Sequence, residues 1–404
     1  YAADIDLNSD NRYKPETAPS TGKKIAIIGA GPGGLSAAYW LQQKGHQCDI
    51  YEAMPKPGGW LRYGIPEYRL PNDLLDQEIE TITELGVIIF CNQKLGENLS
   101  YADLKGKYDS VILTIGSQKG TLLGTEGEDA EGVYSGIDFL RNMEATGQKA
   151  DFRGKTVVVV GGGNTAMDCC RTSIRCKAEK VYVVYRRTEK EMPANPIEIH
   201  ESKIEGVEYL FLTNPVKVNK TSDGKLESVR LIKMALGEPD ASGRRRPVEV
   251  PGSEFDLKTD FILAAIGQKT DVNFLDDINR FAENGALKIN KWGDIDVDPI
   301  SLQTGIAGVF AAGDGVSGPA TIIEAVAQAQ TASASCHQYL MGENINLDPA
   351  EFVSRKDHFN KLNESDFKGH FAIQHRKDMP VLGAKDRFNF REVELGYDSE
   401  ETAL

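Results

Sequence analysis

Two glycine clusters, each directly after a short apolar run, are the segments of this sequence that point most clearly to chemistry. GAGPGG at 29–34 follows the apolar residues 25–28, and GGGNTA at 161–166 follows residues 157–160. Glycines spaced in this way between a strand and a helix let the backbone approach a pyrophosphate, whose charge the helix N-terminus stabilises. Each half is therefore predicted to bind dinucleotide phosphates, through Gly29, Gly31, Gly33 and Gly34 in the first half and Gly161, Gly163, Asn164 and Thr165 in the second.

The residue at the end of the second strand of each half indicates which dinucleotide binds there. Glu52 follows Gly34 by 18 residues, and a carboxylate at this place accepts hydrogen bonds from a ribose 2′-hydroxyl. In the second half the strand ends in Arg186 and Arg187, and a guanidinium pairs with a 2′-phosphate that a carboxylate would repel. Two different dinucleotides are expected, most simply FAD and NADPH, with NADH still possible on the second half. A solvated strand end is the alternative for the two arginines.

A third apolar run, 306–310, leads into a further group of candidates. Asp314 follows it just before a predicted helix, where a carboxylate can bind the ribityl chain of FAD. The helix expected over 320–339 would direct the positive end of its dipole at the flavin and stabilise the negative charge of the reduced form. The alternatives are a simple turn at Asp314 and a core helix without a ligand. The predicted cofactor residues also include three glycines at strand ends, Gly116, Gly267 and Gly313.

The glycine clusters belong to an internal duplication with an offset of 132 residues. Each half also closes with an apolar strand that ends in glycine, VILTIG at 111–116 and FILAAIG at 261–267. Short buried strands that alternate with helical stretches are typical of a parallel sheet covered on both faces. The predicted fold class is α/β, with two Rossmann-like dinucleotide-binding domains.

The composition is that of an acidic globular protein. Among 404 residues, 46 are Lys or Arg and 60 are Asp or Glu, which gives a formal net charge of −14. Nucleic acids and anionic membrane surfaces attract clustered positive charge, so neither is expected as a partner. No apolar run approaches the ~18 residues that cross a bilayer, and the first residues lack the layout of a signal peptide. A cytoplasmic protein is expected, and the start at Tyr1 suggests a processed or excised chain.

The six cysteines and six histidines do not have the spacing of metal ligands, so no zinc or iron–sulfur site is expected within this chain. Cys169, Cys170 and Cys176 lie on one predicted helix at spacings that match no redox pair, and we expect them to pack in the core. No catalytic side chain is predicted, because hydride transfer needs no acid or base at the carbon. The three arginines at 244–246 are predicted to form a solvated loop rather than a basic docking patch.

Several longer segments carry a family resemblance. They are GGWLRYGIP with EYRLP (58–71), GGGNTAMD (161–168), RR with MPA downstream (186–194), AIGQ (265–268) and FAAGD with GPATIIEA (310–325). Together they resemble the small (beta) subunit of NADPH-dependent glutamate synthase, and the flavin and nicotinamide domains of dihydropyrimidine dehydrogenase look similar. The resemblance covers about residues 22 to 345.

The resemblance implies an FAD domain interrupted by an inserted NADPH domain. Residues 22–148 and 268–345 would form the FAD domain, residues 149–267 the NADPH domain, and residues 1–21 and 346–404 terminal extensions. Hydride would pass from nicotinamide C4 to flavin N5. By similarity, Gly59, Leu61 and Thr321 would line the flavin, with Glu324 as an addition.

The family pattern also implies partners. Its members send electrons from the flavin through iron–sulfur clusters held in cysteine-rich segments, and neither segment is present here. The clusters are therefore expected in the full-length protein or in a partner, and the ends of this chain look like places where such segments were removed. The predicted function is an NADPH-dependent flavoprotein module that passes electrons to a partner subunit or domain, such as a glutamate synthase large subunit, a ferredoxin or a molybdenum-containing reductase.

Two other functions stay open on the sequence. One is a self-contained NAD(P)H flavin reductase or monooxygenase, and the other is a non-enzymatic dinucleotide-binding redox sensor. A disulfide reductase is excluded, because no cysteine pair accompanies the glycines at 58–59. The polar tail after Pro349 is expected to wrap the surface through its phenylalanines, Phe352, Phe359, Phe367 and Phe371.

Overall fold

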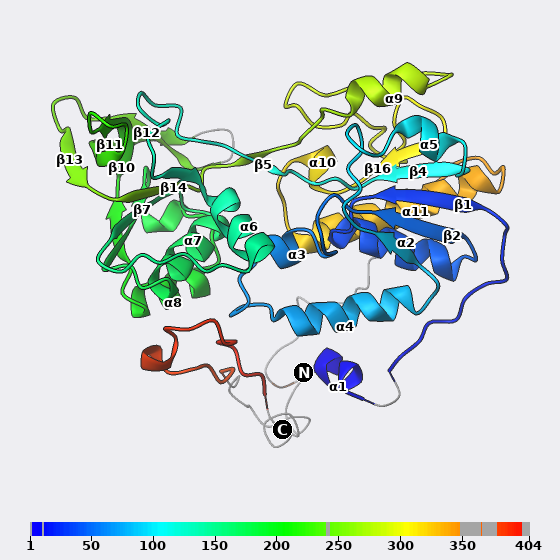
Figure 1. Cartoon of the computed structure of the whole chain (residues 1–404), viewed down its shortest axis with the longest axis horizontal. Helices are drawn as coiled ribbons and strands as arrows, with labels where there is room; N and C mark the ends of the chain where they lie inside the picture. Colours follow the sequence, from blue (N-terminus) through cyan, green and yellow to red (C-terminus); the bar gives the residue numbers. More distant parts are fainter. Residues whose placement is uncertain (1, 10–11, 240–242, 348–364, 366–377, 398–404) are drawn as a thin grey trace.

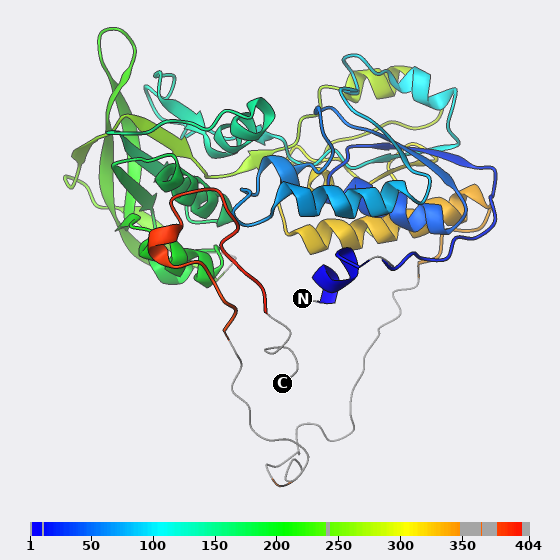
Figure 2. The ribbon, with the colours of Figure 1, turned by 60° about the horizontal axis from the view of Figure 1, so that its bottom comes forward.

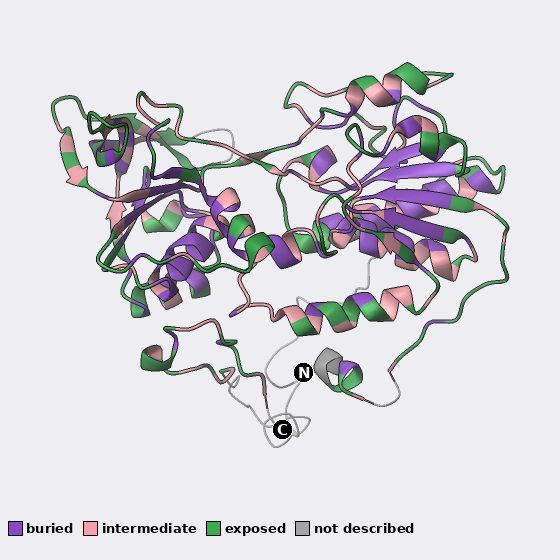
Figure 3. Ribbon diagram, in the orientation of Figure 1, coloured by how far each residue is buried: buried purple, intermediate pink, exposed green. Residues whose placement is uncertain are grey.

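The computed structural model describes residues 2–9, 12–239, 243–347, 365 and 378–397, and these form two units side by side (Figure 1). Each unit is built on a five-stranded parallel sheet. The central strands of both sheets are buried between covering layers (Figure 3), whereas the edge strands β3 and β9 are partly exposed. The predicted α/β class with two Rossmann-like domains is confirmed. The phenylalanines expected to anchor the tail lie outside the described residues.

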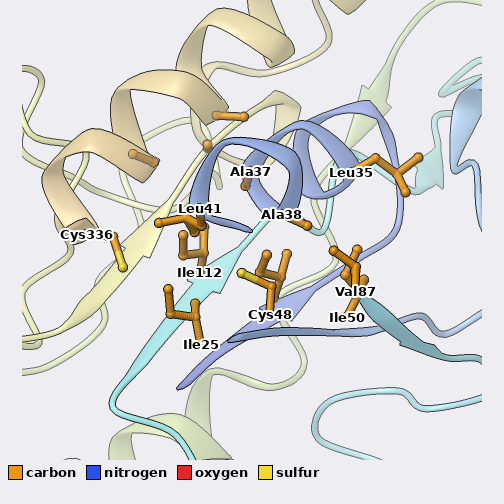
Figure 4. Packing of buried hydrophobic residues seen from close by; sticks show 14 of the residues in the cluster. Ile25, Leu35, Ala37, Ala38, Leu41, Cys48, Ile50, Val87, Ile112 and Cys336 are labelled. Atoms are coloured by element: carbon orange, nitrogen blue, oxygen red, sulfur yellow. The ribbon is translucent and has the colours of Figure 1, made fainter. Parts of the chain in front are cut away.

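The first sheet has the strand order β16-β4-β1-β2-β3. Its central strand faces two cores, because Ile25 and Ile27 point to one side and Ala26 and Ile28 to the other. Figure 4 shows the first of these cores, where Ile25 lies near Leu41 of the covering helix. The strands are β1 (Lys24–Ile28), β2 (Gln47–Tyr51), β3 (Ile88–Phe90), β4 (Ser110–Leu113) and β16 (Val309–Ala311).

Helices cover both faces of the first sheet. Helix α11 (Ile322–Leu340) packs closely on α2 (Pro32–Gln43), because buried small residues such as Ala329 and Ala332 face it. The helix predicted over 320–339 is thus observed with nearly the same bounds. The other helices of the unit are α3 (Trp60–Tyr63), α4 (Asn72–Thr83), α5 (Tyr101–Lys105), α9 (Leu275–Phe281) and α10 (Asp314–Ser317).

The second sheet has the order β6-β14-β7-β8-β9 and repeats the parallel plan of the first. Its strands are β6 (Val133–Ser135), β7 (Thr156–Val160), β8 (Lys180–Tyr185), β9 (Glu208–Phe211) and β14 (Phe261–Ala264). One face is covered by three helices, α6 (Gly136–Thr146), α7 (Asn164–Arg175) and α8 (Pro196–Ile204). The duplication predicted from the sequence therefore extends to the order of four strands, in which β14, β7, β8 and β9 correspond to β4, β1, β2 and β3.

The other face of the second sheet departs from the predicted helical cover. An antiparallel sheet lies there, in which Val229 and Leu231 pack against Val158 and Val160. Its strands are β10 (Thr213–Lys220), β11 (Leu226–Pro239), β12 (Arg245–Glu249) and β13 (Phe255–Lys258). Strands β11 and β12 pair antiparallel and form a hairpin.

The chain crosses between the units twice at one place. Strand β5 (Lys119–Gly120) pairs antiparallel with β15 (Gln268–Lys269). The predicted return to the first domain, at residue 268, falls within this ladder and stays a prediction. The predicted first boundary, between residues 148 and 149, is wrong for β6 and α6, because β6 pairs with β14 in the second sheet. The reason is that the fifth strand of this sheet precedes its glycine loop in the chain.

The described terminal residues lie on these units. Helix α1 (Ala2–Leu7) belongs to the N-terminal extension, and the C-terminal residues 378–397 run along the second unit (Figure 2). A short 3₁₀ helix spans Ala384–Asp386 within residues 378–397, and another spans Glu189–Glu191 in the second unit. None of the helices in the described part of the chain combines the length and apolar character needed to cross a membrane.

Candidate active site

A cavity of about 1250 Å³ lies between the two units and is lined by both. The carboxyl ends of the parallel strands face it, as is usual for ligand sites in such sheets. The predicted cofactor residues that line it are Gly29, Gly31, Gly33, Glu52, Gly59, Leu61, Gly116, Gly161, Gly163, Asn164, Thr165, Arg186, Arg187, Gly267, Gly313, Asp314 and Thr321. Gly34 does not line the cavity, and it has a packing role instead.

The first glycine loop is shaped by two close backbone approaches. Gly29 has a φ of +105°, and a side chain there would collide with the carbonyl of Thr114 at the end of β4. A Cβ at Gly34 would collide with the carbonyl oxygen of Gly29. These two glycines therefore allow the tight turn and the close packing of α2 on β1.

The second loop repeats this geometry. Gly161 has a φ of +144°, and a side chain there would collide with the carbonyl of Ala265, which follows β14 as Thr114 follows β4. Asn164 begins α7, and its side-chain oxygen accepts a hydrogen bond from the N–H of Asn195 at 2.9 Å. The loop is thereby held between the neighbouring strand and the segment before α8.

The shape of both loops fits a pyrophosphate. A Cβ added at Gly163 would meet no heavy atom within 4 Å, and one at Gly31 would meet only the Cα of Gly59, at 3.8 Å. These glycines are the N-cap residues of α7 and α2, and glycine has no side chain that could cap the helix. The first-turn N–H groups of two 12-residue helices therefore border open cavity.

Glu52 directly follows β2, and its carboxylate is buried. Its Oε2 accepts a hydrogen bond from the N–H of Ala30, and its Oε1 accepts one from the N–H of Met54, both at 2.7 Å. Burial raises the pKa of Glu52 above its ordinary value, although these amides oppose the shift. Since a carboxylate oxygen can accept more than one hydrogen bond, the group retains capacity for a hydroxyl donor from the cavity.

The two arginines after β8 have different surroundings. Arg186 is exposed, whereas Arg187 is buried and its Nε donates to the carbonyl oxygen of Arg245 at 2.7 Å. This hydrogen bond ties the β11–β12 hairpin to the end of β8, and Arg244 of the hairpin lines the same cavity. Arg244 is exposed, and its place in the cavity lining is a feature that the prediction of a solvated loop did not include. The basic run was visible in the sequence, but its place beside β8 depends on the antiparallel sheet.

Asp314 is the first residue of α10 and lies close to the start of α11. Its Oδ1 accepts a hydrogen bond from the N–H of Ala320 at 3.3 Å. Burial raises the pKa of Asp314 to about 6, although the Ala320 amide opposes the shift. Thr321 caps α11, with the carboxylate of Glu324 accepting from its N–H at 2.8 Å. Glu324 is thus a capping residue outside the cavity lining.

Two cavity residues form a pair that the sequence does not predict. Arg141 of α6 lies over the ring of Trp60 of α3, with its Cζ 5.2 Å from the ring centre. The Arg141 guanidinium also donates to the carbonyl of Gln118 at 2.5 Å. Trp60 was visible within the segment 58–66, but nothing in the sequence placed Arg141 against it.

The cysteines lie away from this chemistry. All six are free, and Cys169, Cys170 and Cys176 are buried in the core of the second unit, as predicted. Burial raises the pKa of the Cys176 thiol to about 11. Among the described residues, no group of three or more His, Cys, Asp or Glu side chains is arranged to hold a metal ion.

The fold and the cavity define an oxidoreductase with two dinucleotide sites, and comparison with known proteins agrees. Residues 23–329 match the pyridine nucleotide-disulphide oxidoreductase family. The glutamate synthase (NADPH) small chain of Escherichia coli (strain K12) is 35% identical over 78% of this chain and 68% of its own length. The chain belongs to this family, and within it to the relatives of the glutamate synthase small chain.

Two further proteins show how far the similarity extends. Subunit beta of the NADP(+)-dependent formate dehydrogenase of Moorella thermoacetica is 42% identical over 95% of this chain, which spans 53% of that subunit. FprA of Mycobacterium tuberculosis in complex with NADPH has a TM-score of 0.65 at 20% identity, over 85% of this chain and 89% of that one. The likeness to FprA shows the fold alone.

These findings confirm the predicted enzyme class. The chain is an FAD-dependent NAD(P)H oxidoreductase similar to the glutamate synthase small subunit, and FAD and NADPH are confirmed as its cofactors at the level of the family. Which residues hold them stays a proposal.

Proposed function

We propose that this chain is the module of a larger enzyme that oxidises NADPH and passes the electrons to a partner subunit or domain. The observation that carries the proposal is that two phosphate loops open into one cavity, one beside an acidic strand end and the other beside a basic one. Such an arrangement suits two different dinucleotides that meet at their reactive ends.

The first unit supplies the proposed FAD site. The N-terminus of α2 would face the pyrophosphate, Glu52 the adenosine ribose and Asp314 the ribityl chain. Gly59 and Leu61 would lie beside the flavin ring, where the N-terminus of α11 would stabilise negative charge on it. The full proposed set in this unit is Gly29, Gly31, Gly33, Glu52, Gly59, Leu61, Gly116, Gly313, Asp314 and Thr321, and Gly34 supports it by letting α2 pack on β1.

The second unit supplies the proposed NADPH site. The N-terminus of α7 would face the pyrophosphate, and Arg186 would pair with the 2′-phosphate. The buried Arg187 would support this site through its bond to the hairpin, which positions Arg244. The full proposed set is Gly161, Gly163, Asn164, Thr165, Arg186, Arg187 and Gly267, to which the structure adds Arg244.

The protein's part in the reaction is to bind, orient and shield. FAD, when bound, supplies a hydride acceptor for NADPH and a route for electrons to leave. The two units hold the dinucleotides in one cavity, which provides proximity without a side-chain acid or base. In the proposed division of the chain, residues 22–118 with 268–345 bind FAD, and residues 121–267 bind NADPH.

The chain spans 53% and 60% of the first two curated relatives, a formate dehydrogenase subunit and the beta subunit of an NADPH-Fe(3+) oxidoreductase of Geobacter sulfurreducens. The names of these relatives and of the glutamate synthase small chain describe subunits. We therefore propose an electron-accepting partner subunit or domain with iron–sulfur centres, and a cytoplasmic location. A glutamate synthase large subunit is one candidate partner.

Anaerobic titration of the FAD-reconstituted chain tests this function. NADPH should bleach the flavin absorbance at one equivalent per flavin, whereas turnover with oxygen or small acceptors should stay slow without a partner. Failure to retain flavin would contradict the proposal. Fast steady turnover without any partner would favour the self-contained reductase or monooxygenase, and tight binding of both dinucleotides without bleaching would favour the redox sensor.

A further inference from the structure

The densest group of buried charges lies behind the cavity, between α7 and α8. The Arg171 guanidinium pairs with Glu198 at 2.5 Å and with Glu205 at 2.7 Å, and Arg175 pairs with Glu205 at 2.6 Å. All four side chains are buried. Burying charges is costly unless they are paired in good geometry, so these residues form a fixed platform within the second unit.

A residue of the first unit packs against these buried arginines. Tyr68, in the segment between α3 and α4, is fully buried, and its ring centre lies 3.7 Å from Cζ of Arg175 and 5.2 Å from Cζ of Arg171. Its hydroxyl lies 3.3 Å from Oγ1 of Thr172. Cation–π contacts are strongest when they are desolvated, as here. The segment that carries Tyr68 is therefore anchored to α7 of the other unit.

The next residue brings this contact to the cavity wall. Arg69 Nη1 donates to Oδ1 of Asp168 at 2.7 Å, and its Nε lies 3.2 Å from a carboxylate oxygen of Glu198. Arg69 and Asp168 both line the cavity, and Asp168 is otherwise buried. An ion pair thus crosses between the units at the site itself.

The described C-terminal residues also contact Tyr68. We call residues 378–397 the C-terminal strap. The N–H of Val393 donates to the carbonyl of Tyr68 at 2.9 Å, and the ring of Phe390 lies 6.3 Å from that of Tyr68. Arg387 of the strap pairs with Glu201 of α8. The strap thereby joins the Tyr68 segment to the second unit.

Both ends of the Arg69–Asp168 pair lie a few residues from proposed cofactor contacts. Asp168 follows Asn164 by about one turn of α7, whose N-terminus is the proposed NADPH phosphate site. Arg69 follows Leu61 of α3, beside the proposed flavin site, by eight residues. The chain connections between the units, β5 and β15, share a ladder of only two residues each, so side-chain contacts must define the angle between the units.

We propose that Arg69 and Asp168 are positioning residues for hydride transfer, whose ion pair, backed by Tyr68 on the buried arginines of α7, holds the nicotinamide site in register with the flavin site. This inference rests on the proposed function. Because a displacement of about 1 Å can lower a rate about 100-fold, loss of the pair acts on the transfer step rather than on binding.

Stopped-flow reduction of the FAD-loaded 404-residue chain by NADPH tests the proposal. Arg69→Gln and Asp168→Asn should each lower the limiting rate of flavin bleaching about 10- to 100-fold. The double variant should lose no more than the slower single variant, because both act through one pair. Arg69→Lys, which keeps the charge, should recover part of the rate. Flavin content, chemical reduction of the flavin by dithionite and NADPH affinity should change little.

Arg230→Gln is the matched control, since it removes an exposed ion pair with Asp256 outside the cavity. It should leave the limiting rate unchanged. Full-rate bleaching in both Arg69→Gln and Asp168→Asn would overturn the inference, even if their thermal stability fell, because that result would show a purely structural pair. Additive losses in the double variant would also overturn it. If NADPH does not bleach the unsubstituted chain, the proposed function itself fails.

Discussion

Glu52 and Arg186 occupy equivalent places in two copies of the same unit, at the end of the second strand, and they differ in charge. The carboxylate of Glu52 is held by two backbone amides, whereas Arg186 is exposed at the cavity. Arg244 adds a second cation to the basic end, supplied by a hairpin that has no counterpart in the first unit. Selectivity for a phosphorylated ribose is therefore expected to depend on two chain segments.

This expectation can be measured with single substitutions. Arg186→Ala and Arg244→Ala should each weaken NADPH binding about 10-fold or more, because a hydrogen bond to a charged group contributes ~1.5–3 kcal/mol. NADH binding should change little. Calorimetric titration of the FAD-loaded chain with each nucleotide is the measurement.

Arg246→Ala is the control, since Arg246 is exposed on the same hairpin outside the cavity lining. An equal loss of NADH and NADPH affinity in the Arg186 variant would contradict the assignment of the 2′-phosphate.

The residues of the cavity differ in whether the sequence alone could predict their place. Gly29 and Glu52 were predicted at one dinucleotide site and Gly161 at the other, because their spacing from strand to helix is local, and all three line the cavity. Arg141 against Trp60 and Arg69 against Asp168 could not be predicted, since each pair joins different units. The charge of Arg244 was visible in the sequence, but its place in the cavity lining was not.

Three segments of the first unit are joined by a series of hydrogen-bonded side chains. Thr21 Oγ1 lies 2.7 Å from Nδ1 of His46, whose Nε2 lies 2.8 Å from Nδ1 of His337 near the end of α11. Burial and the neighbouring His337 lower the pKa of His46 from 6.5 to about 4. Lys44 and Lys23 act in the same direction, and Asp109 opposes them.

The shift makes stability depend on pH with a definite sign. Between pH 6.5 and 4 the unfolded chain binds a proton at His46 that the folded chain does not. This contribution to stability is thus fully present above pH 6.5 and is lost as the pH falls towards 4. The free energy of unfolding in urea should be lower at pH 5 than at pH 7, and His46→Gln should reduce that difference.

His200→Gln provides the comparison, because His200 is exposed on α8. It should retain the pH dependence of the unsubstituted chain. An unchanged pH dependence in the His46 variant would show that other groups carry it.

Some helices and strands were predicted closely from the sequence pattern, and others were not. Strands such as β1 and β7 were predicted closely, because they are short apolar runs buried on both faces. The first domain boundary was misplaced, because β6 is short and its partner β14 lies more than a hundred residues later. The antiparallel sheet was missed as a covering layer, since alternating polar strands do not reveal which face of which sheet they cover.

The C-terminal strap, which is the described part of the C-terminal extension, contacts both units. Arg387 is buried between the carboxylates of Glu201 and Glu205. Removing one partner of a buried ion pair leaves uncompensated charge and costs about 3–5 kcal/mol. Arg387→Ala should therefore lower the free energy of unfolding by about that amount in urea titrations.

Arg391→Ala, on an exposed residue of the same strap, should change stability by less than about 0.5 kcal/mol. Similar losses in the two variants would show that the strap contributes through general coverage instead of the buried pair.

The two-residue ladder between β5 and β15 has a consequence for how such proteins diversify. Gly120 and Gln268 are paired neighbours, so the chain enters and leaves the second unit at a single point. All five strands of the first sheet lie outside the enclosed residues. The enclosed unit is thus a cassette: if it holds NADPH as proposed, recombination at these two residues would exchange the nicotinamide site while the first sheet keeps all of its strands.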